Sequence, residues 1–139
     1  VRSSVHNAAH EKRSPCVSFE IVDMVKACTP GLTVIDGSTS MEGNGPTDGE
    51  LKKTDLIIAG TNPLATDMVA ARIMGFHKNE VATFAMAIRS GMKPTSLDQV
   101  EIRGEQVESV QMAFKRPEMV PWGDISSWYG AREIHAGTS

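Results

Sequence analysis

The residues best suited to chemistry lie in residues 36–49, which read DGSTSMEGNGPTDG. The carboxylates of Asp36, Glu42 and Asp48 are the oxygen ligands that hard divalent cations prefer. The glycines permit positive φ angles and let backbone N–H groups approach a ligand closely. This stretch therefore predicts a binding site for a divalent metal ion or a polar small molecule. Together with two residues farther along the chain, the predicted ligand-binding residues are Asp36, Met41, Glu42, Gly43, Asn44, Gly45, Asn62 and Asp67.

A second interpretation of the same stretch is structural. Glycine, Asn44, Pro46 and Asp48 are common turn formers, and they can simply build a surface loop. Met41 beside Glu42 favours function, because a flexible linker seldom carries an apolar anchor next to a carboxylate. The stretch lacks the GxxxxGKS/T and Gly-x-Gly-x-x-Gly patterns, so neither a nucleoside triphosphate nor a dinucleotide is indicated.

Asp67 is the other residue of chemical interest, because it lies in the second turn of a predicted helix that is otherwise largely apolar. A carboxylate in such a setting needs a partner or a purpose. It either accepts hydrogen bonds from Thr61, Ser38 or a backbone amide, which is the commoner case, or it joins Asp36 and Glu42 as a metal ligand. No nucleophile lies at a recognisable spacing from a base, so no catalytic residue is predicted and the sequence does not decide whether the chain is an enzyme.

The histidines and cysteines form no metal-binding motif. His6 and His10 are four residues apart but lack the glutamate of HExxH, so we interpret them as solvated side chains. Cys16 and Cys28 are the only cysteines, and their spacing fits neither a disulfide scaffold nor a zinc ribbon. Cys28 falls on the apolar stripe of a predicted helix, which predicts a reduced thiol in the core.

Helical periodicity appears three times. Residues 18–29 place Ile21, Met24 and Val25 on one face, and Pro30 ends that helix. Asn62 is the predicted cap of a second, buried helix that begins at Pro63 and ends at Gly75. A third helix is predicted from about residue 79 to residue 91.

Short β-branched runs predict strands at residues 32–35, 54–59, 100–103 and 107–114, with residues 36–53 as a long loop. A strand, two helices and a strand in that order are typical of a crossover connection, which joins parallel strands. The predicted fold is therefore α/β, a layered mixed sheet with at least one parallel pair and helices packed on it. Ligands bind beyond the carboxyl ends of such strands, where the acidic loop is predicted.

Composition limits the classes of protein to consider. The 139 residues include 14 Lys plus Arg against 17 Asp plus Glu, so there is no basic surplus for nucleic acid. No apolar run approaches the roughly 20 residues of a membrane-spanning helix. We expect one soluble, cytoplasmic α/β domain over residues 1–139, with residues 1–15 and 115–139 peripheral. We also expect the chain to be part of a longer polypeptide, because it starts at Val1 in a polar segment.

Residues 31–75 contain LTVIDG, MEGNGP, IIAGTNP and ATDMVAARIMG, and with these motifs the chain resembles the family catalogued as domain of unknown function 362. The resemblance extends more loosely through residues 102–104. Members of that family are largely uncharacterised and are often described as iron-sulfur-associated proteins with a ferredoxin-like module. The family's motif residues map onto Asp36, Met41, Glu42, Gly43, Asn44, Gly45, Pro46, Asn62, Pro63 and Asp67.

The resemblance implies a redox association but no cluster within this chain, because its two cysteines cannot supply four thiolates. Two functions follow as hypotheses. In the first, Asp36, Glu42 and Asp67 converge on a divalent metal ion or a polar small molecule. In the second, the chain is a noncatalytic scaffold whose loop and Trp122/Trp128 tail dock on the rest of a larger polypeptide or on a ferredoxin-like module.

Overall fold

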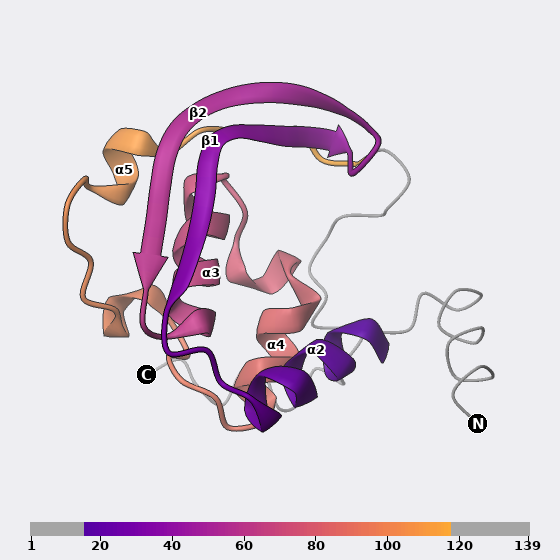
Figure 1. Ribbon diagram of the computed structural model, residues 1–139, viewed down its shortest axis with the longest axis vertical. Coiled ribbons are helices and arrows are strands. Elements are labelled where there is room, and N and C mark those ends of the chain that lie inside the picture. Colours follow the sequence, from indigo (N-terminus) through magenta and orange to yellow (C-terminus); the bar gives the residue numbers. More distant parts are fainter. Residues whose placement is uncertain (1–15, 118–139) are drawn as a thin grey trace.

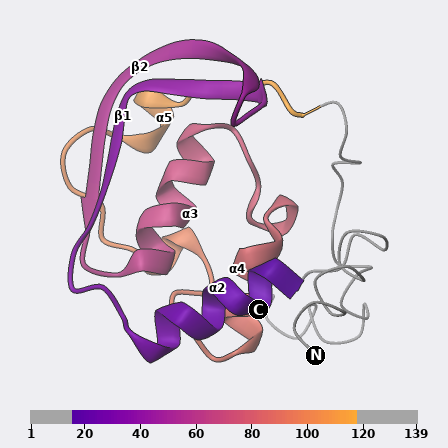
Figure 2. The same cartoon turned by 45° about the vertical axis from the view of Figure 1, so that its right-hand side comes forward.

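The computed structural model describes residues 16–117, and Figure 1 shows their arrangement. Two long strands curve over the helix α3, while the helices α2 and α4 lie together on the other side of α3 (Figures 1 and 2). The elements in chain order are α2 (Cys16–Ala27), β1 (Thr33–Asn44), β2 (Asp48–Gly60), α3 (Pro63–Ile73), η1 (Lys78–Glu80), α4 (Ala82–Arg89), η2 (Leu97–Gln99) and α5 (Val107–Val110).

The predicted loop of residues 36–53 is wrong, because these residues form most of a β-hairpin. β1 and β2 pair antiparallel from Thr33 opposite Gly60 to Asn44 opposite Asp48, with one irregularity between Gly37 and Thr39. Residues 45–47 make the turn. The predicted strands at residues 32–35 and 54–59 are thus the two ends of one hairpin.

The predicted mixed sheet with a parallel pair is also wrong. Within residues 16–117 the sheet has two strands, β1 and β2, and they are antiparallel. The crossover after β2 reaches residues 100–103, but these do not pair as a strand, and part of the predicted strand 107–114 forms α5 instead. A parallel pair needs a second strand in the same sheet. Residues 100–103 make no backbone hydrogen bonds to β2 in the described part of the chain, so they do not supply one.

The helix predictions that depend on local signals are confirmed. Asn62 caps α3, since its side chain accepts a hydrogen bond from the backbone N–H of Ala65 at 3.0 Å. Gly75 and Gly91 adopt positive φ angles of 78° and 88° after α3 and α4, the conformation that ends a helix most cheaply at glycine.

The core consists of two clusters on either side of α3. The first joins α2, α3 and α4 and includes Met86, which is 1% exposed. The second joins α3 to α5 and the inner face of β2.

α2 contributes Val22 to the core, whereas Met24 and the thiol of Cys28, both predicted to be buried, are exposed. The reason is that α2 packs on α4 with Val22 as its buried residue, so Met24 and Cys28 remain in contact with solvent.

Candidate functional site

Glu42 lies near the tip of the hairpin and is already bound by cationic and amide groups of the chain. Its carboxylate accepts hydrogen bonds from Lys52 Nζ at 2.9 Å and from the backbone N–H of Lys115 at 3.1 Å. The side chain is 10% exposed. The Lys52 hydrogen bond, followed by that of Lys115, lowers the pKa of Glu42 below its ordinary value. These contacts make Glu42 a structural link between the hairpin and residues 113–115.

Asp36 stabilises the backbone at the irregularity between Gly37 and Thr39 of β1. Its carboxylate accepts a hydrogen bond from the backbone N–H of Ser38 at 2.9 Å, and this bond is the main reason that the pKa of Asp36 is lowered. On the opposite strand, Thr54 donates a hydrogen bond to the carbonyl of Gly37 and lies 2.9 Å from the hydroxyl of Ser40. Polar side chains thus satisfy the backbone where the strand bends.

Asp67 differs from the other two carboxylates. It lies on the exposed side of α3, yet the surrounding protein desolvates its carboxyl and raises its pKa above the ordinary 3.8. No donor among the described residues contributes to this pKa, and Ser38, one of the predicted partners, binds Asp36 through both its backbone N–H and its side chain.

The three carboxylates predicted as metal ligands do not form one cluster. Asp36 and Glu42 are six positions apart on β1, which is close to 20 Å of strand at about 3.3 Å per residue. Asp67 belongs to α3. Among residues 16–117, no three His, Cys, Asp or Glu side chains lie together in a way that would hold a metal ion.

The other predicted ligand-binding residues build the hairpin tip. A Cβ added to Gly49 would overlap the side chain of Met41, and one added to Gly45 would lie 3.4 Å from its sulfur, so the glycines leave room for Met41 to pack across the turn. Gly43 has a φ of 78° and donates its N–H to the carbonyl of Lys115 at 3.1 Å. Asn44 is paired with Asp48 at the end of the ladder.

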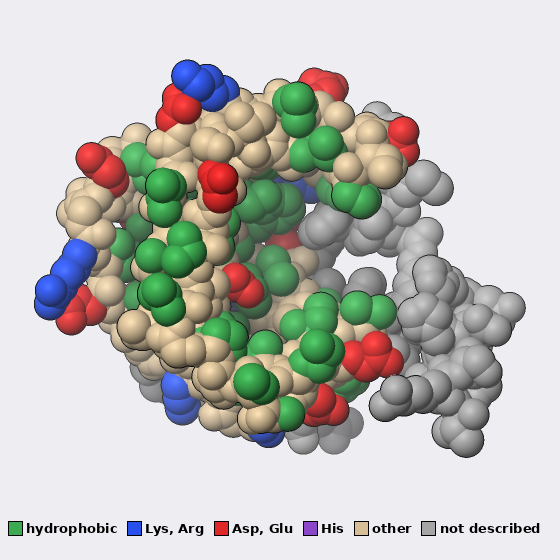
Figure 3. Space-filling view, viewed as in Figure 1, with side chains coloured by type: hydrophobic (Ala, Val, Ile, Leu, Met, Phe, Trp, Pro, Cys, Tyr) green, Lys and Arg blue, Asp and Glu red, His purple; other side chains and the backbone are tan. Residues whose placement is uncertain are grey.

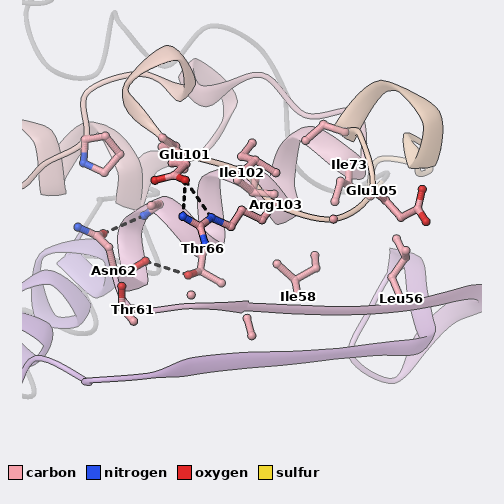
Figure 4. Close-up of a pocket in the computed structure, with 18 of the residues that line it drawn as sticks. Leu56, Ile58, Thr61, Asn62, Thr66, Ile73, Glu101, Ile102, Arg103 and Glu105 are labelled. Carbon is pink, nitrogen blue, oxygen red and sulfur yellow. Dashed lines mark hydrogen bonds and ion pairs between the residues drawn. The ribbon is translucent and has the colours of Figure 1, made fainter.

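A cavity of about 690 Å³ lies outside the predicted loop, between β2, the start of α3 and residues 93–107. Figure 4 shows Leu56 and Ile58 of β2 on one side of the opening and Ile102, Arg103 and Glu105 on the other. Of the predicted site residues, Asn62 lines it, and its side-chain amide also donates to the carbonyl of Lys93 at 2.9 Å. The rest of this cavity escaped sequence reasoning, because its two walls are distant in the chain.

A second feature that sequence reasoning missed is the environment of Arg116. Its guanidinium donates to the carbonyl of Gly75 at 2.9 Å and to Glu80 at 3.1 Å, and it lies 4.0 Å from the ring centroid of Phe76. The backbone N–H of His77 also binds Glu80, which is the main reason that the pKa of Glu80 is lowered. These contacts hold the segment after α5 against the turn that follows α3.

Large apolar side chains are exposed to solvent at several positions of the described residues. Figure 3 shows them gathered over the hairpin and over α2, with the face hollowed between these two regions. Ile57 is 77% exposed, Leu51 75% and Met24 72%. The exposed large apolar residues of α2, of the hairpin and of the segment between them are Val17, Phe19, Ile21, Met24, Leu32, Val34, Leu51 and Ile57, and we call this set the apolar face.

Comparison with known proteins places these features in a family. The profile of the family described as Domain of unknown function (DUF362) matches residues 1–72, more than half of the chain. The chain belongs to the DUF362 family. The matched region includes the whole hairpin and nearly all of α3, and it ends before the cavity's second wall.

This DUF362 chain is also 30% identical over 100 residues to a thylakoid-associated protein of Synechocystis sp.. The aligned region is 72% of this chain but 31% of the relative, so the chain spans about a third of the relative's length. No solved structure matches the chain. In the described part of the DUF362 chain, no helix has the length and hydrophobicity needed to cross a membrane.

Proposed function

We propose that this chain is a noncatalytic interaction module that docks through its apolar face on another domain or subunit. The observation that carries the proposal is the exposure of eight large apolar side chains on the hairpin, on α2 and between them. Scattered exposed apolar residues are ordinary, but a gathering of large ones on one face is typical of an interaction surface. Acidic groups are dispersed around these regions in Figure 3, as expected for the rim of such a surface.

The hairpin gives this proposal its physical basis. Its inner face packs on α3 through Leu56 and Ile58, while Val34 and Ile57 lie on the outer face, where they are 59% and 77% exposed. Strands with apolar residues on both faces are typical of sheets that are covered on both sides. A two-stranded hairpin is also marginally stable alone, so covering its outer face would stabilise it.

The partner we propose is the remainder of a larger polypeptide or a ferredoxin-like module, acting in the cytoplasm. The relative's length supports the first, since this chain spans 31% of it. The residues do not fit an iron-sulfur cluster of their own, because the sequence has two cysteines and no metal-binding group occurs within residues 16–117. An iron-sulfur cluster would therefore belong to the partner, and this chain would supply the surface on which the partner docks.

Sedimentation of the purified chain tests the proposal. The uncovered face should make the wild type associate as its concentration rises, and Ile57→Lys should keep it monomeric, because a charge in the contact is costly to bury. Ser109→Lys, which adds the same charge at an exposed position of α5 outside the apolar face, is the matched control and should associate like the wild type. A wild type that stays monomeric up to millimolar concentration, or equal association of the wild type and Ile57→Lys, would refute the proposal.

A second candidate function retains part of the predicted ligand site. Asp67 carries a carboxylate on the exposed side of α3 that the surrounding protein partly desolvates, and we propose it as a ligand for a divalent cation or a cationic small molecule. Addition of a divalent ion should then raise the melting temperature, and Asp67→Asn should abolish the rise. Glu42→Gln should retain it, because Glu42 is already occupied by Lys52 and Lys115. Equal shifts in all three proteins would exclude Asp67 as the ligand.

A further inference from the structure

We infer that the free edge of β2 accepts an extended peptide strand, which inserts into the cavity between β2 and residues 99–105. This surface shares only Ile57 with the apolar face, and the inference stands on separate observations. The occupant we assign is an uncharged segment with apolar side chains at every second position, supplied by the part of the family polypeptide that this chain does not span.

The first observation is the pattern of residues that line the cavity. Every residue from Leu56 to Asn62 lines it on one side, and every residue from Gln99 to Glu105 lines it on the other. Successive side chains of a strand point to opposite faces of the sheet. Consecutive strand residues can therefore share one cavity only if the backbone edge itself faces it. The cavity runs along the edge of β2 that is not paired with β1.

The second observation is that this edge has no backbone partner within residues 16–117. The sheet ends at β2, and no backbone hydrogen bond of the described part joins residues 56–60 to residues 99–105. In an antiparallel pair, every second residue directs its N–H and C=O away from the neighbouring strand. Such a row of free donors and acceptors is a template for another strand.

The third observation concerns the opposite wall. Sequence reasoning predicts a strand at residues 100–103, and Val100 has the extended conformation, with φ −107° and ψ 122°. This wall nevertheless pairs with no strand. A segment inserted between the walls would pair with β2 and lie alongside residues 100–103, which would explain why a run with strand-like composition stands apart from the sheet.

The chemistry of the cavity identifies the occupant. Its floor is apolar, built by the buried residues Val69, Ile73 and Val107. At the rim, Arg103 and Glu101 pair with each other at 2.8 Å, and the other charged lining residues, Lys93 and Glu105, are of opposite sign, so the lining carries no net charge. A volume of about 690 Å³ lies within the roughly 300–1,000 Å³ of ordinary ligand sites and suits a short segment. The assigned source rests on the length of the relative, of which this chain spans 31%.

A peptide titration followed by amide NMR tests the inference. The probe is an uncharged heptapeptide of alternating valine and threonine, and its control is the same peptide with methylated backbone nitrogens. The plain peptide should shift the amide signals of residues 56–60 and slow the hydrogen exchange of those amides in this stretch that are not bonded to β1, whereas the methylated peptide should bind at least tenfold more weakly, because it lacks the donors for strand pairing. Equal binding of both peptides, or no binding of either at millimolar concentration, would overturn the inference.

Two variants locate the binding. Ile102→Trp, at the rim of the cavity, should weaken binding of the plain peptide at least tenfold. Leu51→Trp, on the apolar face, should leave it unchanged, so a failure here is distinguishable from a failure of the proposed function. In the native family polypeptide, residues 56–60 should already be protected from exchange. If they exchange as fast there as in the isolated chain, the assigned source is wrong.

Discussion

Replacement of Asn62 by alanine gives the sharpest prediction for the fold, because its side chain makes two separate bonds. Its Oδ1 accepts the N–H of Ala65 at 3.0 Å and caps α3, and its Nδ2 donates to the carbonyl of Lys93 at 2.9 Å. Loss of a cap costs about 1 kcal/mol, and loss of an ordinary hydrogen bond costs about 1 kcal/mol. Asn62→Ala should therefore lower the free energy of unfolding by about 2 kcal/mol.

Urea denaturation of matched variants separates the two contributions. Asn62→Asp keeps a good capping acceptor but loses the donor to Lys93, so it should lose about 1 kcal/mol, half the effect of alanine. The slope of unfolding against urea should stay unchanged, because the surface exposed on unfolding is the same. If Asn62→Ala is as stable as the wild type, or if Asn62→Asp is as unstable as alanine, this residue does not have the structural role described.

Three further predictions concern packing and charge. Gly60→Ala should cost about 1–3 kcal/mol by calorimetry, because its Cβ would overlap Thr66 Oγ1, whereas Gly31→Ala, with open space around it, should not. Met86→Ala should cost about 2–5 kcal/mol in urea, because the side chain is 1% exposed, and a loss below 1 kcal/mol would refute its core role. The lowered pKa of Glu42 contributes stability above its ordinary 4.5 that is lost as pH falls through the lowered value, so Glu42→Gln should flatten the acid limb of stability against pH.

The features that sequence predicts well are those encoded by neighbouring residues. Asn62 before Pro63 marks the start of α3, and Gly75 and Gly91 mark the ends of α3 and α4, because caps and left-handed terminators depend on a few adjacent positions. The family assignment succeeds for a related reason, since its motifs are contiguous and the matched profile covers residues 1–72.

The hairpin was missed because its strands are stabilised across the pair and not along the chain. Residues 36–44 are rich in glycine and hydroxyl side chains, which predict a loop by composition. In the structure they pair with residues 48–57, with one irregularity between Gly37 and Thr39, and Met41 packs over the glycines of the turn. The prediction of a parallel pair was wrong for a similar reason. A run such as residues 100–103 becomes a strand only if it forms backbone hydrogen bonds with another strand.

The candidate site shows the same limit. Glu42 looks like a free ligand in the sequence, but the backbone that binds it belongs to Lys115, 73 positions away. The walls of the cavity, residues 56–62 and 99–105, are likewise distant in the chain. Local patterns identify residues able to do chemistry, whereas tertiary contacts decide which of them are already occupied.

Methionine oxidation tests the proposed interaction surface most directly. Met24 on the apolar face is 72% exposed, and the buried Met86, which is 1% exposed, is an internal control. Dilute peroxide should oxidise Met24 rapidly in the isolated chain, as measured by mass spectrometry of its peptides, and Met86 slowly. In the protein purified under native conditions from its source cells, the docking account predicts that Met24 is protected at least tenfold while Met86 is unchanged. Equal oxidation of Met24 in the two samples would contradict the account.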